Sequence, residues 1–441
     1  MKIDLQTVVD NAPVKSLQIR VALICALVMM VDGYDLTIIG VALPSIISGM
    51  KVDASVAGVV ASCALIGMML GAMGLGALAD KIGRVRSIAL CVFIFSFFTG
   101  IGGFVDSPWQ LAALRFVAGL GLGGVLPSIL AAVSEVTPKR IRSRFTMLMF
   151  AAYPTGGIIA TVIGKHYLEV HGWQILFFVA FVPLILIPLI LKGIPESAAV
   201  LQKLGDHAAL RKLATSLDPS LKIDESSVIQ NHTVSHHSGA PITRLFQEDR
   251  AISTCMLWLS LFMGLFTLYA LHSWLTKLMG MAGHTPGTAL TFLLMLNIGA
   301  VVGSCLSGWL ADKYGIQRVL FVSLIIGGCC IAVLAQPLPQ TVLFGVAFML
   351  GITVPAAQGL CFTYSSQFYP SDIRSTGIGM ASGVGRIGGI LAPMIIGVFI
   401  SLNLPFEQNF YLLASAAILQ AIAITFINNR VADFNVSRVQ S

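Results

Sequence analysis

The sequence contains about twelve apolar runs, each long enough to cross a lipid bilayer as a helix. A span needs roughly 20 predominantly apolar residues. The runs cover residues 21–47, 54–78, 87–105, 109–133, 145–167, 173–192, 251–278, 286–310, 317–335, 340–364, 375–401 and 407–427. Charged residues make up 11% of the chain, whereas a soluble domain carries about 25%. The pattern predicts an all-α membrane protein with twelve transmembrane helices.

The lysines and arginines lie mainly on one side of these spans. That side holds Lys2, Lys15, Arg20, Lys81, Arg84, Arg86, Lys139, Arg140, Arg142, Arg144, Lys192, Lys313, Arg318 and Arg374. The opposite loops offer only Lys51, Lys165 and Lys277. Basic loops remain in the cytoplasm, so we expect both termini there. The first run carries two aspartates and is too long for a cleavable signal peptide, so it is expected to be the first span.

A polar stretch at residues 193–248 divides six spans from six. It predicts an N-terminal half (1–192), a cytoplasmic central loop (193–248) and a C-terminal half (249–441). The loop histidines His232, His236 and His237 could bind a metal ion, but a solvated linker is favoured. The eight cysteines lie in apolar runs without a CxxC pattern, so all are expected to be small buried hydrophobic residues.

The two halves share an internal repeat. Gly76-x-x-x-Asp80-Lys81-x-Gly83 recurs as Gly308-x-x-x-Asp312-Lys313-x-Gly315, and 308 − 76 = 232. Pro138 and Pro370, each followed by x-x-Ile-Arg-Ser, have the same offset, as do Gly156-Gly157 and Gly388-Gly389. Six helices per copy give both halves the same membrane orientation, so we expect a pseudo-two-fold axis along the membrane normal and a binding site between the halves.

Two acids, Asp32 and Asp35, interrupt the first apolar run. At i and i+3 they project from roughly one helix face, and ionisable groups at membrane depth are expensive and usually functional. Burial favours the neutral form of a carboxyl group and a nearby cation favours its charged form, so such a pair can load and release protons. The alternative is a structural hydrogen-bonded pair that only tightens helix packing.

Arg115 is expected at a depth similar to that of Asp35. Arg115 follows Pro108 by seven residues, or about 10 Å, and Asp35 precedes Pro44 by nine residues, or about 13 Å. A pair of Arg115 with Asp35 or with Asp32 is therefore plausible, either as a permanent ion pair or as part of the transport site.

Arg386 is the only charged residue of the eleventh span and lies about 17 Å from its start. An unpaired guanidinium there suggests a bidentate site for a carboxylate ligand. The alternatives are a backbone-carbonyl anchor or a pair with Asp32. The repeat-equivalent residues of Arg386, Arg115 and Asp32 are Pro154, Ala347 and Gly264, so the scaffold is duplicated while the charged site is not.

Several motifs resemble one family of membrane transporters. The segment Gly76–Arg86 resembles the loop 2–3 signature of the major facilitator superfamily, and Arg115–Gly124 and Ile194–Ser197 resemble its helix 4 and helix 6 segments. Asp32-Gly33-Tyr34-Asp35-Leu36 is similar to the helix 1 motif of the superfamily's aromatic acid:proton symporters. The resemblance implies transport of benzoate-like acids. In the second loop copy, Ile316-Gln317-Arg318 leaves the basic pair incomplete, so that end is expected to be held less tightly.

Other polar residues receive roles within this interpretation. A conformational latch at the cytoplasmic helix ends is expected from Asp80, Arg84, Glu135, Arg142 and Asp312, unless the basic residues only set topology. Substrate binding is assigned to Arg386, Arg115, Tyr34, Tyr153 and Asn297. Other residues could line the substrate site, although such residues more often serve in packing or as interfacial anchors. They are Tyr269, His272, Trp274, Phe362 and Tyr364. His272 is expected to be a gate residue or a bystander.

The sequence therefore predicts proton-coupled uptake of a small aromatic carboxylate, such as benzoate or hydroxybenzoate, across a bacterial inner membrane. The sequence contains no enzyme motif, metal site or nucleic-acid interface that would favour another function. It also contains no nucleotide-binding motif, so a proton gradient is the expected energy source. One chain supplies a complete pathway and is expected to function as a monomer. The alternatives are a carrier of another organic anion such as a muconate-like dicarboxylate, a facilitator or exporter, and a receptor without transport. Tyr153-Pro154-Thr155-Gly156-Gly157 lacks the Gly-Pro pair of drug-exporting antiporters, which disfavours export.

Overall fold

The computed structural model describes residues 2–4, 8–10, 14–138, 140–203, 205–217, 228–230, 242–247, 249–370 and 373–428. Within them, twelve helices are long and apolar enough to cross a membrane. The expected spans are confirmed, and their ends differ from the predicted ones by a few residues.

The first six spans are α2 (Ser16–Met50), α3 (Ala54–Ile82), α4 (Arg84–Ile101), α5 (Pro108–Val136), α6 (Arg142–His171) and a broken sixth span. The sixth consists of α7 (Gln174–Val179), the 3-10 turn η2 (Val182–Ile185) and α8 (Leu186–Gly193). Pro183 lies at the break, where proline removes a helix hydrogen bond and crowds the preceding turn. A second 3-10 turn, η1 (Gly102–Phe104), follows α4.

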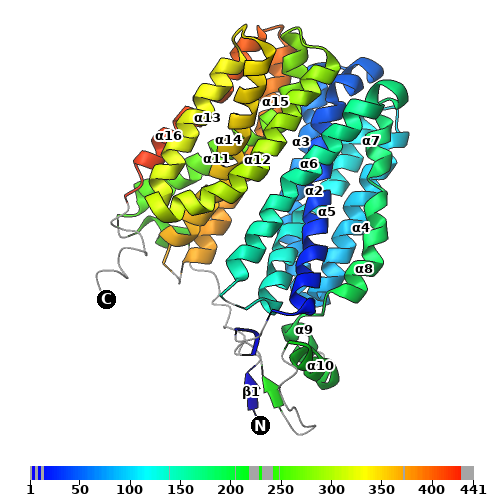
Figure 1. Ribbon diagram of the computed structural model, residues 1–441, viewed down its shortest axis with the longest axis vertical. Coiled ribbons are helices and arrows are strands. Elements are labelled where there is room, and N and C mark those ends of the chain that lie inside the picture. Colours follow the sequence, from blue (N-terminus) through cyan, green and yellow to red (C-terminus); the bar gives the residue numbers. More distant parts are fainter. Residues whose placement is uncertain are drawn as a thin grey trace.

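The last six spans are α11 (Ala251–Met281), α12 (Pro286–Tyr314), α13 (Ile316–Leu334), α14 (Gln340–Phe368), α15 (Arg374–Ser401) and α16 (Phe406–Thr425). Figure 1 shows them on one side of the molecule and the first six spans on the other. Together the two sets form a twelve-helix bundle with two six-helix halves. We call the end where α2 begins and where α3 meets α4 the basic end, and the end where α2 reaches Met50 the far end.

The central segment contains secondary structure that the sequence did not indicate. Helices α9 (Ala198–Lys203) and α10 (His207–Leu217) lie at the basic end below the first half (Figure 1), and η3 (Ile242–Phe246) precedes α11. Leu210, Leu213 and Leu217 of α10 are buried in the same cluster as Val21 of α2. Strands β1 (Lys2–Asp4) and β2 (Val228–Gln230) pair in parallel. The segment is therefore more than the polar linker that was expected, while His232, His236 and His237 lie outside the described residues.

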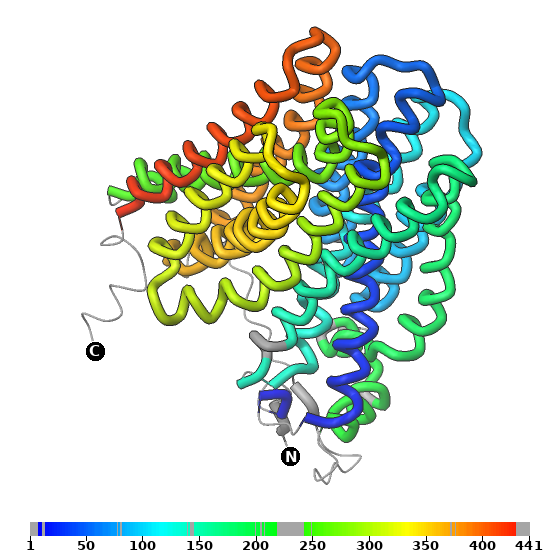
Figure 2. Tube along the Cα trace, turned by 45° about the horizontal axis from the view of Figure 1, so that its top comes forward, coloured from blue at the N-terminus to red at the C-terminus, as the bar shows by residue number. Residues whose placement is uncertain are grey.

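The buried residues form three clusters that show how the halves meet. One cluster contains residues of both halves, including Ile38 and Leu43 of α2 with Ala270 and Trp274 of α11. The other two each combine residues of one half with residues of the central segment, such as Leu210 and Leu245, and lie toward the basic end. The halves therefore share a core at the far end. The tube view in Figure 2 shows the same two groups of helices side by side.

The cysteine prediction is wrong in part. Cys25, Cys91 and Cys361 are buried and Cys63 and Cys330 are half-buried, but Cys255, Cys305 and Cys329 are exposed on helix surfaces. A membrane protein turns apolar residues outward as well as inward, so an apolar run does not by itself predict burial.

Candidate functional site

Asp35 and Arg115 form a buried ion pair inside the first half. The side chains of both residues are 1% exposed, and Arg115 Nη1 donates to Asp35 Oδ2 at 2.8 Å. Arg115 Nη2 also donates to the main-chain oxygen of Asp35 at 3.3 Å. Of the two pairings that the sequence left open, the structure shows this one. Arg115 therefore binds α2 through both a carboxylate and a backbone carbonyl.

Thr99 of α4 completes this pair. Its hydroxyl donates to Asp35 Oδ1 at 2.5 Å and lies 3.4 Å from Arg115 Nη1. The sequence analysis missed Thr99, although a threonine inside an apolar run is a polar signal that could have identified it. With both carboxylate oxygens bonded, Asp35 is fixed by α4 and α5 together.

Asp32, one turn earlier on α2, has a different environment. The residue is 3% exposed, and its Oδ1 is buried without a hydrogen-bond partner among the described residues. It interacts electrostatically with Arg386 of α15, Tyr153 of α6 and Tyr269 of α11. Asp32 and Tyr153 belong to the first half, and Tyr269 and Arg386 belong to the second. The groups that act on Asp32 therefore come from both halves.

Arg386 is half-buried and bridges the halves. Its Nη1 donates to the main-chain oxygen of Met68 on α3 at 2.7 Å. The backbone-carbonyl anchor that the sequence left open is thus present. One N–H···O bond leaves further N–H groups of the five-donor guanidinium fork for a ligand.

The other predicted substrate-binding residues lie apart from this group. Tyr34 donates its hydroxyl to the main-chain oxygen of Leu176 on α7 at 2.8 Å, which directs it into the first half. Asn297 is 1% exposed, donates to the main-chain oxygen of Leu293, and hydrogen bonds the side chain of His272. Arg115 is enclosed with Asp35. Among the predicted set, Tyr153 and Arg386 are thus brought together with Asp32.

The two halves pack closely from this level to the far end. A Cβ on Gly157 would lie 2.4 Å from Asn297 Oδ1, and a Cβ on Gly40 would lie 1.7 Å from the main-chain oxygen of His272. Ser62 donates to the main-chain oxygen of Ile390 at 2.7 Å. We call these contacts the far-end seam. The three named here join uncharged groups, and Lys165 Nζ of α6 adds a hydrogen bond to Thr291 Oγ1 of α12 at 3.1 Å. Toward the basic end, a Cβ on Gly379 or Gly383 of α15 would meet no atom within 4 Å.

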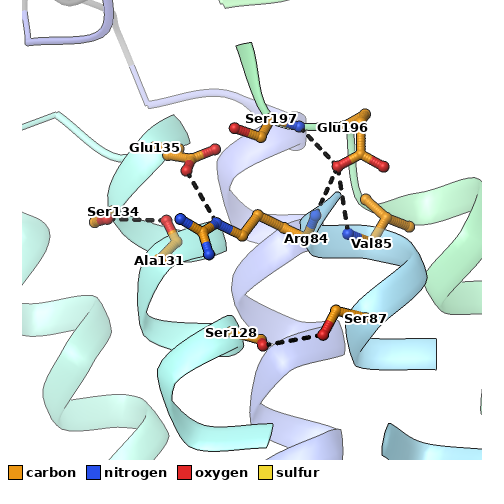
Figure 3. Close-up of polar contacts among 9 residues, drawn as sticks. All are labelled: Arg84, Val85, Ser87, Ser128, Ala131, Ser134, Glu135, Glu196 and Ser197. Carbon is orange, nitrogen blue, oxygen red and sulfur yellow. Dashed lines mark hydrogen bonds and ion pairs between the residues drawn. The ribbon is translucent and has the colours of Figure 1, made fainter. Parts of the chain in front are cut away.

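At the basic end, two residues assigned to the predicted latch, Arg84 and Glu135, lie together (Figure 3). Arg84 Nε lies 3.5 Å from Glu135 Oε1. Glu196 Oε1 accepts from the backbone nitrogens of Arg84 at 2.8 Å and Ser197 at 3.0 Å, and it lies 3.5 Å from that of Val85. Glu196 therefore caps the N-terminus of α4, where backbone N–H groups lack helical partners.

Glu196 joins these contacts, although the sequence analysis did not include it in the predicted latch. Gly83, with φ +100°, precedes α4 and brings the carboxylate close. Of the remaining latch residues, Asp312 is exposed and makes no ion pair within the described part of the chain. The side chains of Asp80 and Arg142 lie outside the described residues.

The comparisons with known proteins agree with this architecture. The sequence matches the Major Facilitator Superfamily over residues 25–393 and 283–435. It is 37% identical to the benzoate transport protein of Acinetobacter baylyi, covering 97% of this chain and 93% of that protein. It is 33% identical to the gentisate transporter of Corynebacterium glutamicum, covering 90% and 84% respectively.

A solved structure supports the same fold. The inward open conformation of the xylose transporter XylE from E. coli superimposes with a TM-score of 0.72 at 16% identity, covering 96% of this chain and 99% of that one. With twelve candidate spans, the chain is a multi-pass membrane transporter and not an enzyme. It belongs to the Major Facilitator Superfamily and, within it, to the family of aromatic acid transporters.

Proposed function

We propose that this protein imports a small aromatic carboxylate together with protons across a bacterial inner membrane. The observation that carries the proposal is that Arg386 of the second half crosses to the first half, where its Nη1 donates to the main-chain oxygen of Met68 and its charge acts on the buried Asp32. A proton site and an anion site that act on each other in this way give each ligand an electrostatic reason to affect the other. The benzoate and gentisate relatives support an aromatic acid as substrate.

Arg386 is proposed to hold the substrate carboxylate. Its guanidinium reaches from α15 to Met68 of the opposite half, and charge-assisted bidentate bonds to a carboxylate are strong and directional. Tyr269 interacts electrostatically with Arg386 and with Tyr153, and the two tyrosine rings offer apolar faces to an aromatic substrate. Because Arg115 already forms an ion pair with Asp35, only the guanidinium of Arg386 remains at this depth, among the described residues, to bind a substrate carboxylate. This favours a monocarboxylate over a muconate-like dicarboxylate.

The two aspartates of α2, Asp32 and Asp35, are proposed to form the proton-coupling site, in which a carboxylate takes up the proton that moves with the substrate. Protons from outside neutralise carboxylate charge while the anion binds, the halves rock about the site, and both ligands leave on the other side. Alternating access of this kind is rigid-body movement of one half against the other. The far-end seam must part in the outward-facing state, and the latch around Arg84, Glu135 and Glu196 must rearrange with it. Asp80, Arg142 and Asp312 are kept as proposed members of the latch.

The orientation and organisation form part of the same proposal. The basic loops put the termini and the 193–248 segment in the cytoplasm, so the seam closes the periplasmic side. The two halves are residues 1–192 and 249–441, and one chain forms a complete transport unit. Transport needs no cofactor, because the proton gradient supplies the energy.

The test is uptake into proteoliposomes under an imposed pH gradient, acid outside. We expect accumulation of benzoate or a hydroxybenzoate, weaker uptake of muconate, and no accumulation without the gradient. The Arg386→Lys variant keeps the charge but loses the fork, and Arg386→Ala loses both. We expect apparent affinity to fall about 10-fold or more in Arg386→Ala, in line with roughly 1.5–3 kcal/mol for a charge-assisted bond. Wild-type accumulation by Arg386→Ala would remove the proposal, and efflux-only activity would favour the exporter alternative.

A further inference from the structure

Asp32 and Asp35 differ in what holds them, although they are one turn apart on the same helix. Asp35 has an arginine on one oxygen and a threonine hydroxyl on the other, all three side chains being almost fully buried. Asp32 has a buried oxygen without a partner among the described residues. A motif with two equivalent-looking acids therefore places them in two unlike sites.

We infer that Asp32 alone carries the coupled proton, and that Asp35 stays ionised throughout the cycle as the fixed counter-ion of Arg115. The inference rests on the proposed proton symport and assigns it to one side chain.

The first argument concerns what a proton would leave behind. If Asp35 were neutralised, Arg115 would keep its charge in a site where it is 1% exposed and where Asp35 is its ion-pair partner among the described residues. Breaking a buried pair from one side leaves an uncompensated charge, which is strongly unfavourable. Asp35, Arg115 and Thr99 all belong to the first half. Movement of one half against the other therefore does not separate them.

The second argument concerns the groups around Asp32. The titratable and charged groups that interact with it are Asp35 on its own helix, Cys91 of α4, Tyr153 of α6, Tyr269 of α11 and Arg386 of α15. The only cation among them is Arg386, and it belongs to the opposite half. Movement of the halves therefore changes the field at Asp32, whereas it leaves Asp35 with its own cation.

The charges balance in both states of the site. Without substrate, ionised Asp32 and Arg386 sum to zero. With substrate, Asp32 has accepted one proton and become a neutral carboxylic acid, and the carboxylate of the substrate neutralises Arg386. The substrate and ionised Asp32 thus compete for one guanidinium, and proton binding to Asp32 releases Arg386 for the anion. The proton passes from a hydronium ion in the external water to a carboxylate oxygen of Asp32, so one O–H bond breaks as another forms, and it returns to water on the cytoplasmic side.

The experiment separates proton coupling from substrate movement in proteoliposomes loaded with benzoate. Counterflow without a pH gradient measures binding and alternating access, and accumulation under a pH gradient measures coupling. We expect Asp32→Asn to keep counterflow within about 3-fold of the wild type while losing accumulation at least 10-fold. Its counterflow should not vary with pH. Asp32→Glu should retain accumulation, and Asp106→Asn, an exposed aspartate between η1 and α5, should behave like the wild type.

The second arm removes the fixed pair as a unit. Asp35→Asn alone should lose both activities, but the double variant Asp35→Asn, Arg115→Gln should regain accumulation to within about 10-fold of the wild type, because no charge is left unpaired. A potassium diffusion potential without a pH gradient should drive no benzoate accumulation, since one proton and one monocarboxylate carry no net charge.

The possible results are distinct. Accumulation by Asp32→Asn, or a double variant that exchanges benzoate at the wild-type rate but cannot accumulate it, would place the proton on Asp35 and overturn the inference while leaving symport intact. Accumulation driven by the potential alone would also overturn it, because more than one proton would then move per substrate. Wild-type accumulation that ignores the pH gradient would instead refute the proposed symport itself.

Discussion

The two halves of this transporter use the same glycines to bring helices together, but only one half carries the buried ion pair. A Cβ on Gly156 would lie 1.7 Å from the main-chain oxygen of Met30, and a Cβ on Gly388 would lie 2.3 Å from that of Phe262. The offset is 232 for both members of the contact, since 388 − 156 = 232 and 262 − 30 = 232. The same correspondence relates Gly67, Gly71 and Gly119 to Gly299, Gly303 and Gly351.

The buried ion pair has no counterpart at this offset. Asp35 corresponds to Thr267, Thr99 to Ile331 and Arg115 to Ala347. Thr267 donates its hydroxyl to the main-chain oxygen of Met263 within its own helix, and Ala347 is fully buried. Close helix packing therefore needs small residues in both copies. A buried charge needs a complete set of partners, and this set is present in the first copy.

The basic end shows the same asymmetry. Gly83 and Gly315 both have positive φ before α4 and α13. The carboxylate of Glu196 lies against Gly83, while a Cβ on Gly315 would meet no atom within 4 Å. The residue 232 positions after Glu196 is Asn428. In the second copy, Gln317 Nε2 donates instead to the main-chain oxygens of Ile424 and Ile427, so different contacts hold the two loop copies.

The largest effect is expected from breaking the buried pair. Asp35→Asn should lower stability by about 3–5 kcal/mol, because it leaves Arg115 uncompensated. Its counterpart Thr267→Ala should cost about 1 kcal/mol, the value of one ordinary hydrogen bond. Thermal unfolding in detergent, followed by size-exclusion chromatography, measures both. Equal destabilisation of the two variants would show that the charged pair has no special structural role.

The next effect concerns the glycine contacts that the halves share. Gly156→Ala and Gly388→Ala should each destabilise by about 1–3 kcal/mol, because a methyl group would overlap a carbonyl oxygen and force the helices apart. The control is Gly345→Ala on α14, where a Cβ would meet no atom within 4 Å. The same thermal assay applies. If either glycine variant matched the control, the packing of the two halves would not be equivalent.

Thr99→Val should follow in size, at about 1.5–3 kcal/mol. The change conserves shape but removes a hydrogen bond to a charged group, and such bonds contribute in this range. Its counterpart Ile331→Val removes one methylene and should cost about 0.5–1.5 kcal/mol. Comparing the unfolding temperatures of the two variants measures the difference. A smaller loss for Thr99→Val than for Ile331→Val would mean that Asp35 does not need this hydroxyl.

The smallest effect is expected at the basic end. Glu196→Gln keeps a hydrogen-bond acceptor at the N-terminus of α4 but loses the charge, which should cost about 0.3–1 kcal/mol through the helix dipole. Asn428→Asp adds a charge at the equivalent position and should change stability by less. The ratio of inward- to outward-facing molecules, read by cysteine accessibility at the far end, should shift only for Glu196→Gln. An unchanged ratio would assign Glu196 to folding alone.

The spans, the duplication and the depth of the charged residues could all be predicted from the sequence. Hydropathy identifies a span because an unpaired backbone group cannot remain in lipid, and a fixed rise per residue converts position into depth. Those two facts placed Asp35 and Arg115 at one level before any contact was known. The constant offset of 232 also predicted which glycines would correspond.

The direction in which each side chain points depends on the packing of the helices against one another, which the sequence does not show. Asp32 and Asp35 lie on nearly the same helix face, and the rotation of α2 that gives Arg115 to Asp35 is set by close packing against α6, where Gly156 meets Met30. The same packing turns Tyr34 toward α7 and leaves Asp32 beside Arg386. Helix periodicity fixes the relative angles of residues along one helix, but the angle between helices depends on contacts hundreds of residues apart in the chain.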